Sequence, residues 1–161
     1  MCDICKTIEK SLNGGNPYFV KELKTGIVVL GWNQHFYGYT LFMCKKHATE
    51  LYNLESEFQA EYLKEMVVVA KAVSQAFDAE KMNYECLGNG DTHLHFHLFP
   101  RKTGDLGEYG NDGKGPVWWL PQNIMWNVDN IPTDSELEDM KAKLNYKLDK
   151  LLFKNSTEIN D

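Results

Sequence analysis

Long hydrophobic runs are missing from this sequence. No apolar stretch approaches the ~18 residues that a membrane-spanning helix needs, and no charged start is followed by an apolar segment of the signal-peptide type. Internal repeats, low-complexity tracts and linker-like stretches are missing as well. We therefore expect a cytoplasmic protein without a membrane contact, folded as one domain over residues 1–161.

Positive charge is also scarce. Lysine and arginine number 17 against 23 acidic residues, which gives a formal net charge of −6. Such a chain repels polyanions, so we expect no nucleic acid polymer as a partner. A small phosphorylated ligand would need a local group of cations. Lys45, Lys46, Arg101 and Lys102 are the candidates for such a patch, unless each is an ordinary solvated surface charge.

Cysteines are few, at positions 2, 5, 44 and 86. In a cytosolic chain, a close pair is more typical of metal or redox chemistry than of a disulfide. Cys2 and Cys5 form a CxxC pair, whose spacing lets two thiolates bind one zinc ion. Free surface thiols and redox chemistry are the alternatives. Cys44 and Cys86 lie in apolar surroundings and are predicted to be small core residues.

Histidine is rare too, yet three of the five histidines fall within GDTHLHFHLFPR, residues 90–101. They occupy positions 93, 95 and 97 and alternate with apolar residues. Side chains alternate between the two faces of a strand, so the histidines should share one face and Leu94, Phe96 and Leu98 should bury the other. Pro100 has no amide hydrogen, and the strand is expected to end there. Ordinary hydrogen-bonded histidines, a metal site and a catalytic row are the possible interpretations.

Further strands are indicated on both sides of the molecule's longest helical pattern. Residues 18–23 and 26–31 are predicted as strands joined by a tight turn, and residues 38–44 as a third strand. Residues 83–88 and the histidine strand, 93–99, are predicted to form a hairpin around Gly88, Asn89 and Gly90.

Two capping-box patterns predict the starts of helices. SEFQ, with Ser56 as the N-cap, precedes apolar residues at helical spacing and predicts a long helix to about residue 80. Thr133 and Glu136 precede a second helix over residues 133–153. Residues 102–132 form an aromatic loop region whose tryptophans either anchor a packed loop, form a dimer contact or stack on a base. The sum is an α+β fold: an antiparallel sheet with a long central helix and a C-terminal helix.

The segment HLHFHLF fits the pattern His-φ-His-φ-His-φ-φ, where φ is apolar. Together with CDIC near the start, GYTLFMCKKH at 38–47 and LGNGDTHLHFHLFPR at 87–101, it resembles the histidine triad (HIT) superfamily of nucleotide hydrolases and transferases over residues 1–101. The resemblance implies a HIT-like fold. It also implies that His95 attacks an α-phosphorus to form a nucleotidyl-histidine intermediate, while His97 holds the phosphate or the leaving group. A neutral imidazole suits this attack, because its ordinary pKa is ~6.5.

The resemblance also implies a zinc site. In members with an N-terminal CxxC, both cysteines, the histidine that ends the KKH block and the first triad histidine bind zinc. The matching positions here are Cys2, Cys5, His47 and His93. Four protein ligands leave no open position on the ion, so this zinc is expected to be structural.

Some positions depart from the family pattern. Where many members have Gly-Gln-Ser before the triad, this chain has Gly-Asn-Gly, so Asn89 is the expected phosphate contact with a side chain one methylene shorter. Where members have Gly-His-Thr before the third strand, this chain has Tyr39 in the middle position. His35, three residues earlier, does not simply replace that histidine and is predicted to be a surface or loop residue. Asn33 lies near a position that contacts the ribose in relatives.

The resemblance favours a zinc-containing nucleotide hydrolase, with dinucleoside polyphosphates as first candidates because HLFPRK is similar to the members that hydrolyse dinucleotides. A nucleoside phosphoramidate hydrolase or a nucleotidyl transferase is the alternative within the family. A metallohydrolase with all three triad histidines on a catalytic metal is another class, and a non-catalytic nucleotide-binding or interaction module is a third. Members often form two-fold dimers, so a homodimer is expected.

Overall fold

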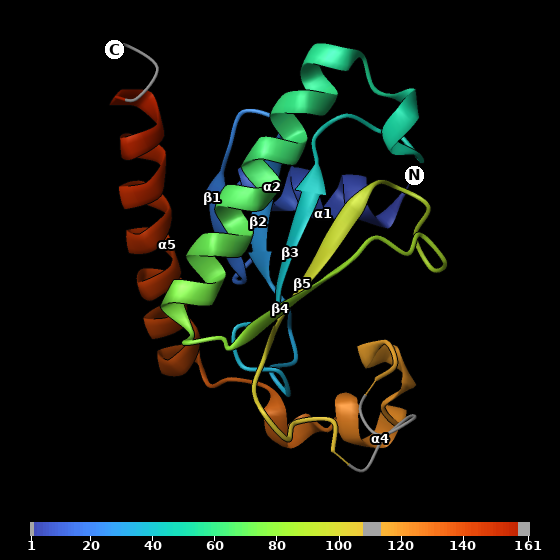
Figure 1. Ribbon diagram of the computed structural model, residues 1–161, viewed down its shortest axis with the longest axis vertical. Helices are drawn as coiled ribbons and strands as arrows, with labels where there is room; N and C mark the ends of the chain where they lie inside the picture. Colours follow the sequence, from blue (N-terminus) through green and yellow to red (C-terminus); the bar gives the residue numbers. More distant parts are fainter. Residues whose placement is uncertain (1, 108–113, 158–161) are drawn as a thin grey trace.

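One antiparallel sheet organises the protein. The computed structural model describes residues 2–107 and 114–157. Its strands lie in the order β1-β2-β3-β5-β4, and every neighbouring pair is antiparallel (Figure 1). The strands are β1 (Phe19–Glu22), β2 (Gly26–Leu30), β3 (Thr40–Cys44), β4 (Lys81–Glu85) and β5 (His95–Arg101). The predicted α+β fold with an antiparallel sheet is confirmed.

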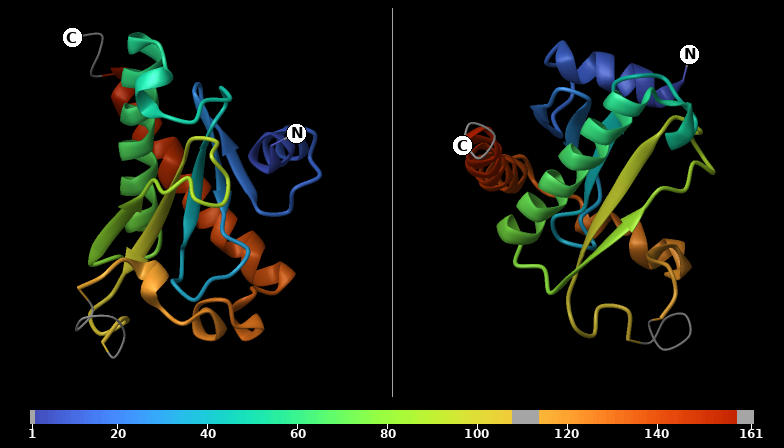
Figure 2. Two further views of the ribbon diagram at one scale, coloured as in Figure 1. Left: turned by 90° about the vertical axis from the view of Figure 1, so that its right-hand side faces the viewer. Right: turned by 45° about the horizontal axis from the view of Figure 1, so that its top comes forward.

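Helices cover both faces of the sheet. The long helix α2 (Ser56–Ala76) crosses one face of the sheet (Figure 1). Helix α5 (Asp134–Thr157) lies beside α2 and packs against α2 and β1. Helix α1 (Asp3–Leu12) lies on the opposite face, as the side view in Figure 2 shows. Its Ile4 and Ile8, one helical turn apart, pack against Ile27, Val29 and Met43 of the sheet. This helix was not expected from the sequence, because its remaining positions are mostly polar.

The alternation in the histidine segment is reproduced by the two faces of β5. Leu94, Phe96 and Leu98 join the core beneath α2 and are almost completely buried. His95 and His97 project to the α1 face, beside Met43 and Leu41 of the neighbouring strand β3. His93 was predicted to lie in the strand, but it precedes β5, which begins at His95.

Strand β5 does not end at Pro100 as predicted. It continues to Arg101, and β4 pairs with it through Met82↔Pro100 and Lys81↔Arg101. The pairing with β3 stops at Leu98, so beyond that point β5 has only one neighbour. A proline is tolerated there because its missing donor can face the unpaired side.

The β4–β5 connection is longer than the predicted hairpin. The strands begin at Lys81 and His95, and residues 86–94 join them without regular structure. Cys86 lies in this connection and is exposed, so its predicted core position is wrong, whereas Cys44 is buried as predicted.

Of the two predicted capping boxes, the one at Ser56 is absent from the structure. Glu55, not Ser56, is the N-cap of α2, and Gln59 donates its side-chain N–H to the Leu51 carbonyl (2.7 Å) instead of closing a capping box. The helix ends at Ala76, earlier than predicted, and Asp78 follows with a left-handed φ of 53°.

The predicted capping box at Thr133 is present. The Glu136 carboxylate accepts from the Thr133 amide at 2.8 Å, and the Thr133 hydroxyl accepts from the Glu136 amide at 3.4 Å. Helix α5 then continues to Thr157, beyond the predicted end at residue 153.

The aromatic loop region forms a second small core at one end of the sheet (Figure 1). It contains η2 (Val117–Trp119), α4 (Gln122–Met125) and η3 (Val128–Asn130), while residues 108–113 lie outside the described residues. Trp126 stacks on Trp32 with 5.4 Å between ring centroids, and Trp118 packs against Trp126 at 5.5 Å. The described helices include none that is both long and apolar enough to cross a membrane. The expected cytoplasmic location and single domain stay predictions.

Candidate metal centre and histidine row

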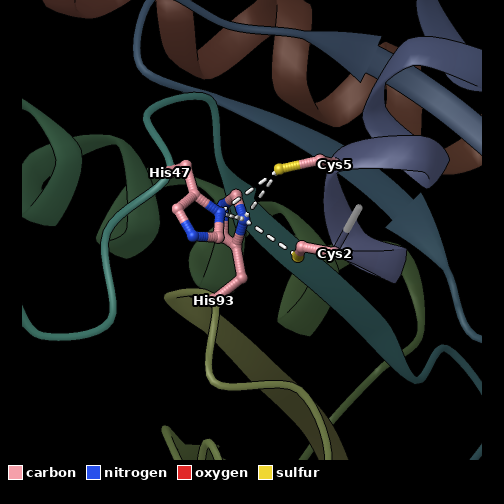
Figure 3. A group of neighbouring side chains, drawn as sticks. All are labelled: Cys2, Cys5, His47 and His93. Carbon is pink, nitrogen blue, oxygen red and sulfur yellow. Dashed lines mark hydrogen bonds between the residues drawn. The ribbon is translucent and has the colours of Figure 1, made fainter.

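A cluster of two thiols and two imidazoles joins three parts of the fold. Cys2 and Cys5 come from the start of α1, His47 from the segment after β3, and His93 from the residues before β5 (Figure 3). Their ligand atoms all lie within 4.8 Å of one another. The four predicted zinc ligands are thus brought together, although their sequence separation reaches 91 residues.

The geometry of the cluster fits a tetrahedral ion. The two imidazole Nδ1 atoms are 3.2 Å apart, and Cys5 Sγ lies 3.3 Å from His47 Nδ1 and 3.4 Å from His93 Nδ1. Cys2 Sγ lies 3.5 Å from His93 Nδ1. Zinc bonds of about 2.05 Å to nitrogen and about 2.3 Å to sulfur place nitrogens about 3.3 Å apart and nitrogen and sulfur about 3.6 Å apart. The residues present therefore fit zinc.

His93 is oriented for this role by its other ring nitrogen. Its Nε2 is 2.7 Å from the Cys44 carbonyl, which only accepts, so Nε2 carries the proton and Nδ1 presents a lone pair toward the thiols. Burial lowers the pKa of His93, which favours the neutral form that a metal ligand needs.

His95 uses its ring in the opposite sense. Its Nδ1 lies 2.6 Å from the His93 carbonyl and must donate to it, so a neutral His95 has its lone pair on Nε2. That Nε2 is 2.9 Å from the Nε2 of His97. The His95 side chain is 6% exposed, so its free nitrogen is held in a fixed direction.

His97 completes a hydrogen-bonded row. Its Nδ1 lies 2.6 Å from the Tyr39 hydroxyl, and Trp118 meets its ring edge-on with 5.2 Å between centroids. Burial, and then the neighbouring His95, lower the pKa of His97 to about 3. The imidazole is therefore neutral near pH 7, with one proton, and each of its two nitrogens has a hydrogen-bond partner.

The row opens into a cavity of about 390 Å³. Its walls are the residues of the 87–91 loop together with His95, His97 and Trp118. A smaller cavity of about 170 Å³ reaches His95 from the side of His93 and contains Glu50. Among the described residues, neither cavity is lined by a lysine or arginine.

The predicted basic patch does not face these cavities. Lys45 pairs with Glu22 at 2.5 Å, and Lys46 lies over the Phe58 ring. Arg101 bonds to Asp105 and to the Asn83 side chain. Lys102 is exposed and also lies outside both cavity walls. None of these four cations lines either cavity, so within the cavity walls phosphate charge would be met by neutral hydrogen-bond donors.

The other predicted contacts separate into two groups. Asn89 is exposed and lines the larger cavity with His95 and His97. Asn33 is 1% exposed, donates to the Asn127 carbonyl (2.7 Å) and accepts from the His35 amide (3.0 Å). The structure thus places Asn33 in the loop scaffold and outside the cavity wall, and its ribose contact stays a prediction.

Two residues at the site were not singled out by the sequence. Trp118 forms a wall of the larger cavity, whereas the sequence left the tryptophans of its segment as loop anchors, a dimer contact or a base-stacking surface. Gln34 holds the loop before β3, because its amide donates to the Gly31 and Tyr39 carbonyls and accepts from the Gly38 amide. Nothing in the local sequence pattern marks Gln34.

Comparison with known proteins gives one consistent family. The HIT domain family matches residues 20–104. An uncharacterised HIT-like protein of Borreliella burgdorferi is 31% identical over 125 residues, which cover 71% of this chain and 80% of that protein. The Protein hit of Bacillus subtilis is 28% identical over 123 residues, covering 73% and 78%.

Solved structures agree in fold. A histidine triad protein from Marinobacter aquaeolei has a TM-score of 0.66 and 26% identity, covering 83% of this chain and 89% of that one. A zinc-bound histidine triad family protein from Mycobacterium smegmatis has a TM-score of 0.60 over 93% and 94% of the two chains, at 18% identity. The second likeness concerns the fold alone.

Proposed function

This chain belongs to the HIT domain family, and from that premise we propose that it hydrolyses nucleotide derivatives at an α-phosphorus through a nucleotidyl-histidine intermediate. One observation carries the proposal: His95 Nδ1 is bound to the His93 carbonyl, which leaves the Nε2 lone pair as the reactive group at a cavity wall. A neutral imidazole attacks without a separate base, since it has no proton to lose first.

The reaction has two balanced steps. The Nε2 lone pair of His95 forms a nitrogen–phosphorus bond while the bond from phosphorus to the leaving group breaks. The leaving group departs with that electron pair and takes up one proton from solvent, which an amine must do as it leaves. Water then attacks phosphorus and gives one proton back to solvent, the nitrogen–phosphorus bond breaks, and the nucleoside monophosphate leaves with neutral His95 restored. His97 and Asn89 are proposed to bind the phosphoryl oxygens with their N–H groups.

Cys2, Cys5, His47 and His93 are proposed to hold one zinc ion. The tetrahedral fit of the four ligand atoms supports this, and a histidine triad relative from Mycobacterium smegmatis is zinc-bound. With four protein ligands the ion supplies structural cross-linking and no open coordination position. His93 would then be fixed at both ring nitrogens, which also fixes the backbone carbonyl that orients His95.

Dinucleoside polyphosphates are the substrates proposed first, from the HLFPRK segment. The charge of the cavities favours a second candidate, nucleoside phosphoramidates. Asp91 and Glu50 lie in the cavity walls, and no described lysine or arginine does. An amine leaving group suits such walls better than a polyphosphate chain, because the carboxylates repel added negative charge.

The catalytic-metal alternative meets a geometric difficulty. His93 directs one ring nitrogen to the thiols and the other to a backbone carbonyl, so neither is left for a metal shared with His95 and His97. A non-catalytic binding module has no such difficulty and is decided by experiment.

The test is product analysis by chromatography at neutral pH, with a panel of dinucleoside polyphosphates and adenosine phosphoramidates. Wild type should release a nucleoside monophosphate, His95→Ala should not, and His35→Ala should match wild type as a histidine control. Mass spectrometry of the acid-free quenched protein should find a nucleotidyl adduct only when His95 is present. Equal turnover by wild type and His95→Ala would exclude His95 as the nucleophile, and no turnover by either would favour the binding module.

A homodimer is proposed as the assembly. Strand β4 is at the end of the sheet order, and its outer edge has no partner strand among the described residues. Tyr84 on this strand is 49% exposed, which suits a contact with a second copy. Light scattering across a concentration series measures the mass directly, and a constant monomer mass would reject the dimer.

A further inference from the structure

Tyr39 lies just before β3, and its hydroxyl contacts the histidine row. The hydroxyl lies 2.6 Å from His97 Nδ1, and the side chain is 4% exposed. The aromatic ring is parallel to Phe99, with 4.3 Å between centroids and an interplanar angle of 6°. On the other side it lies against Gly31, where an added Cβ would come within 2.1 Å of the ring.

The backbone around Tyr39 is fixed as firmly as its ring. The Tyr39 amide donates to the Phe36 carbonyl at 2.8 Å, and its carbonyl accepts from the Gly31 amide at 2.9 Å. Gln34 adds a further bond to the Tyr39 carbonyl at 3.1 Å. Because the backbone and the ring of Tyr39 are both held, its hydroxyl points toward His97.

The row then has only one consistent set of protons. His95 Nδ1 donates to the His93 carbonyl, so His95 Nε2 accepts and His97 Nε2 must be the donor between the two rings. Neutral His97 consequently has an unprotonated Nδ1, which accepts from Tyr39. Burial raises the pKa of Tyr39, so its hydroxyl keeps the proton that it donates.

We propose that Tyr39 is a positioning residue: its hydroxyl donates to Nδ1 and holds the His97 ring in place, with the proton on Nε2 as His95 requires. In this tautomer the Nε2–H faces the atom that reacts: the lone pair of His95 at rest, and an oxygen or the leaving atom of the substrate during attack. The other tautomer would place two lone pairs 2.9 Å apart and offer the substrate no donor. This inference rests on the proposed function, but the tautomer itself is a property of the free protein.

The first test therefore needs no substrate. Long-range nitrogen–proton NMR on zinc-loaded, uniformly ¹⁵N-labelled protein distinguishes a protonated Nδ1 from a protonated Nε2, and His97→Gln assigns the signals. Wild type should show His97 protonated on Nε2. Tyr39→Phe should keep that proton, because His95 Nε2 still needs a donor, but it should shift the His97 Nδ1 signal, which loses its hydrogen bond. A wild-type proton on Nδ1, or no change in Tyr39→Phe, would overturn the proposal even if the enzyme hydrolyses nucleotides.

Tyr62→Phe is the matched control. Tyr62 is also buried, and its hydroxyl also makes one bond, to the Phe42 carbonyl at 3.1 Å, but it touches no histidine of the row. Both variants keep the ring and remove one oxygen, so both should fold. Only Tyr39→Phe should change the His97 signals.

Kinetics give the second test. With an unactivated leaving group, Tyr39→Phe should lower kcat about tenfold, equivalent to about 1.4 kcal/mol, and leave KM within about twofold. With a p-nitrophenyl nucleotide ester, whose leaving group needs little help, the loss should shrink to about twofold or less. An equal loss for both leaving groups would place the His97 donor on a phosphoryl oxygen, and no loss with either substrate would reject the positioning role. If wild type turns over neither substrate, the proposed function fails and the NMR result alone decides the role of Tyr39.

Discussion

His93 and His95 are two residues apart, yet they use their rings in opposite ways. His93 gives Nε2 to the Cys44 carbonyl and turns Nδ1 toward the two thiols. His95 gives Nδ1 to the His93 carbonyl and turns Nε2 toward His97 and the cavity. The ring nitrogen that a backbone carbonyl occupies decides which nitrogen is left for chemistry, so identical side chains in one short segment suit the two different roles proposed for them, metal ligand and nucleophile.

The surroundings of the two histidines differ as much as their rings do. The metal end is assembled from α1, the segment after β3 and the residues before β5, so a bound ion would cross-link three parts of the fold. The reactive end is built within the sheet and the loop before β3, with Tyr39, Phe99 and Trp118 packed around His97. A substitution that disrupts one end should therefore leave the structure of the other end intact.

The largest expected effect is loss of the nucleophile at the reactive end. His95→Ala should lower turnover by about 10⁴-fold or more, because no other group forms the intermediate. Zinc content by atomic emission should remain one ion per chain. Loss of zinc together with turnover would show that the two ends are not separable.

Next is removal of the metal end. Cys5→Ala should lose zinc and, since binding at 1,000 times Kd stabilises the folded state by about 4 kcal/mol, should lower Tm by about 10 °C. Cys86→Ala is the control, because Cys86 is exposed and outside the cluster. Thermal unfolding and metal analysis check this, and an unchanged zinc content in Cys5→Ala would contradict the assignment of the ligands.

A smaller effect is expected from crowding the reactive end. Gly31→Ala pushes a methyl group into the Tyr39 ring and should destabilise the fold by about 1–3 kcal/mol while shifting the His97 Nδ1 signal. Gly15→Ala is the matched control, because its added Cβ would meet mainly the flexible side chain of Lys10. Urea unfolding and NMR measure both effects, and zinc binding should be equal in the two variants. If Gly31→Ala were as stable as Gly15→Ala, the loop before β3 would have to shift and accommodate the added methyl group, which would contradict the expected clash.

The smallest effect concerns acid. The pKa of His97 is about 3 when folded and near its ordinary 6.5 when unfolded, so the unfolded chain binds more protons between these values. Stability from this group is present above pH 6.5 and is lost as the pH falls toward 3. His95 and Tyr39 face His97, and Glu85 lies opposite it on β4. His97→Gln should reduce the pH 7 to pH 5 fall in unfolding free energy by on the order of 1 kcal/mol. If plots of unfolding free energy against pH were parallel for wild type and His97→Gln, a contribution of His97 to the acid dependence would be rejected.

Local patterns predicted much of the fold. The period-two alternation placed Leu94, Phe96 and Leu98 in the core, and the Thr133 capping box marked the start of α5. The boundaries of β4 and β5 were missed because pairing with a neighbour, not local composition, decides where a strand stops. Helix α1 was missed because its stability comes from packing Ile4 and Ile8 on the sheet.

The sequence by itself determined the chemical groups of the site: two cysteines at CxxC spacing and three alternating histidines, whose residue types permit zinc binding and attack on phosphorus. Only the tertiary structure decided how they are used. It brought His47 and His93 to the cysteines, gave each triad imidazole one carbonyl or hydroxyl partner, and placed Tyr39 beside His97. The reason is physical: spacing fixes which face a side chain shares, whereas the tautomer of an imidazole depends on partners that approach from elsewhere in the chain.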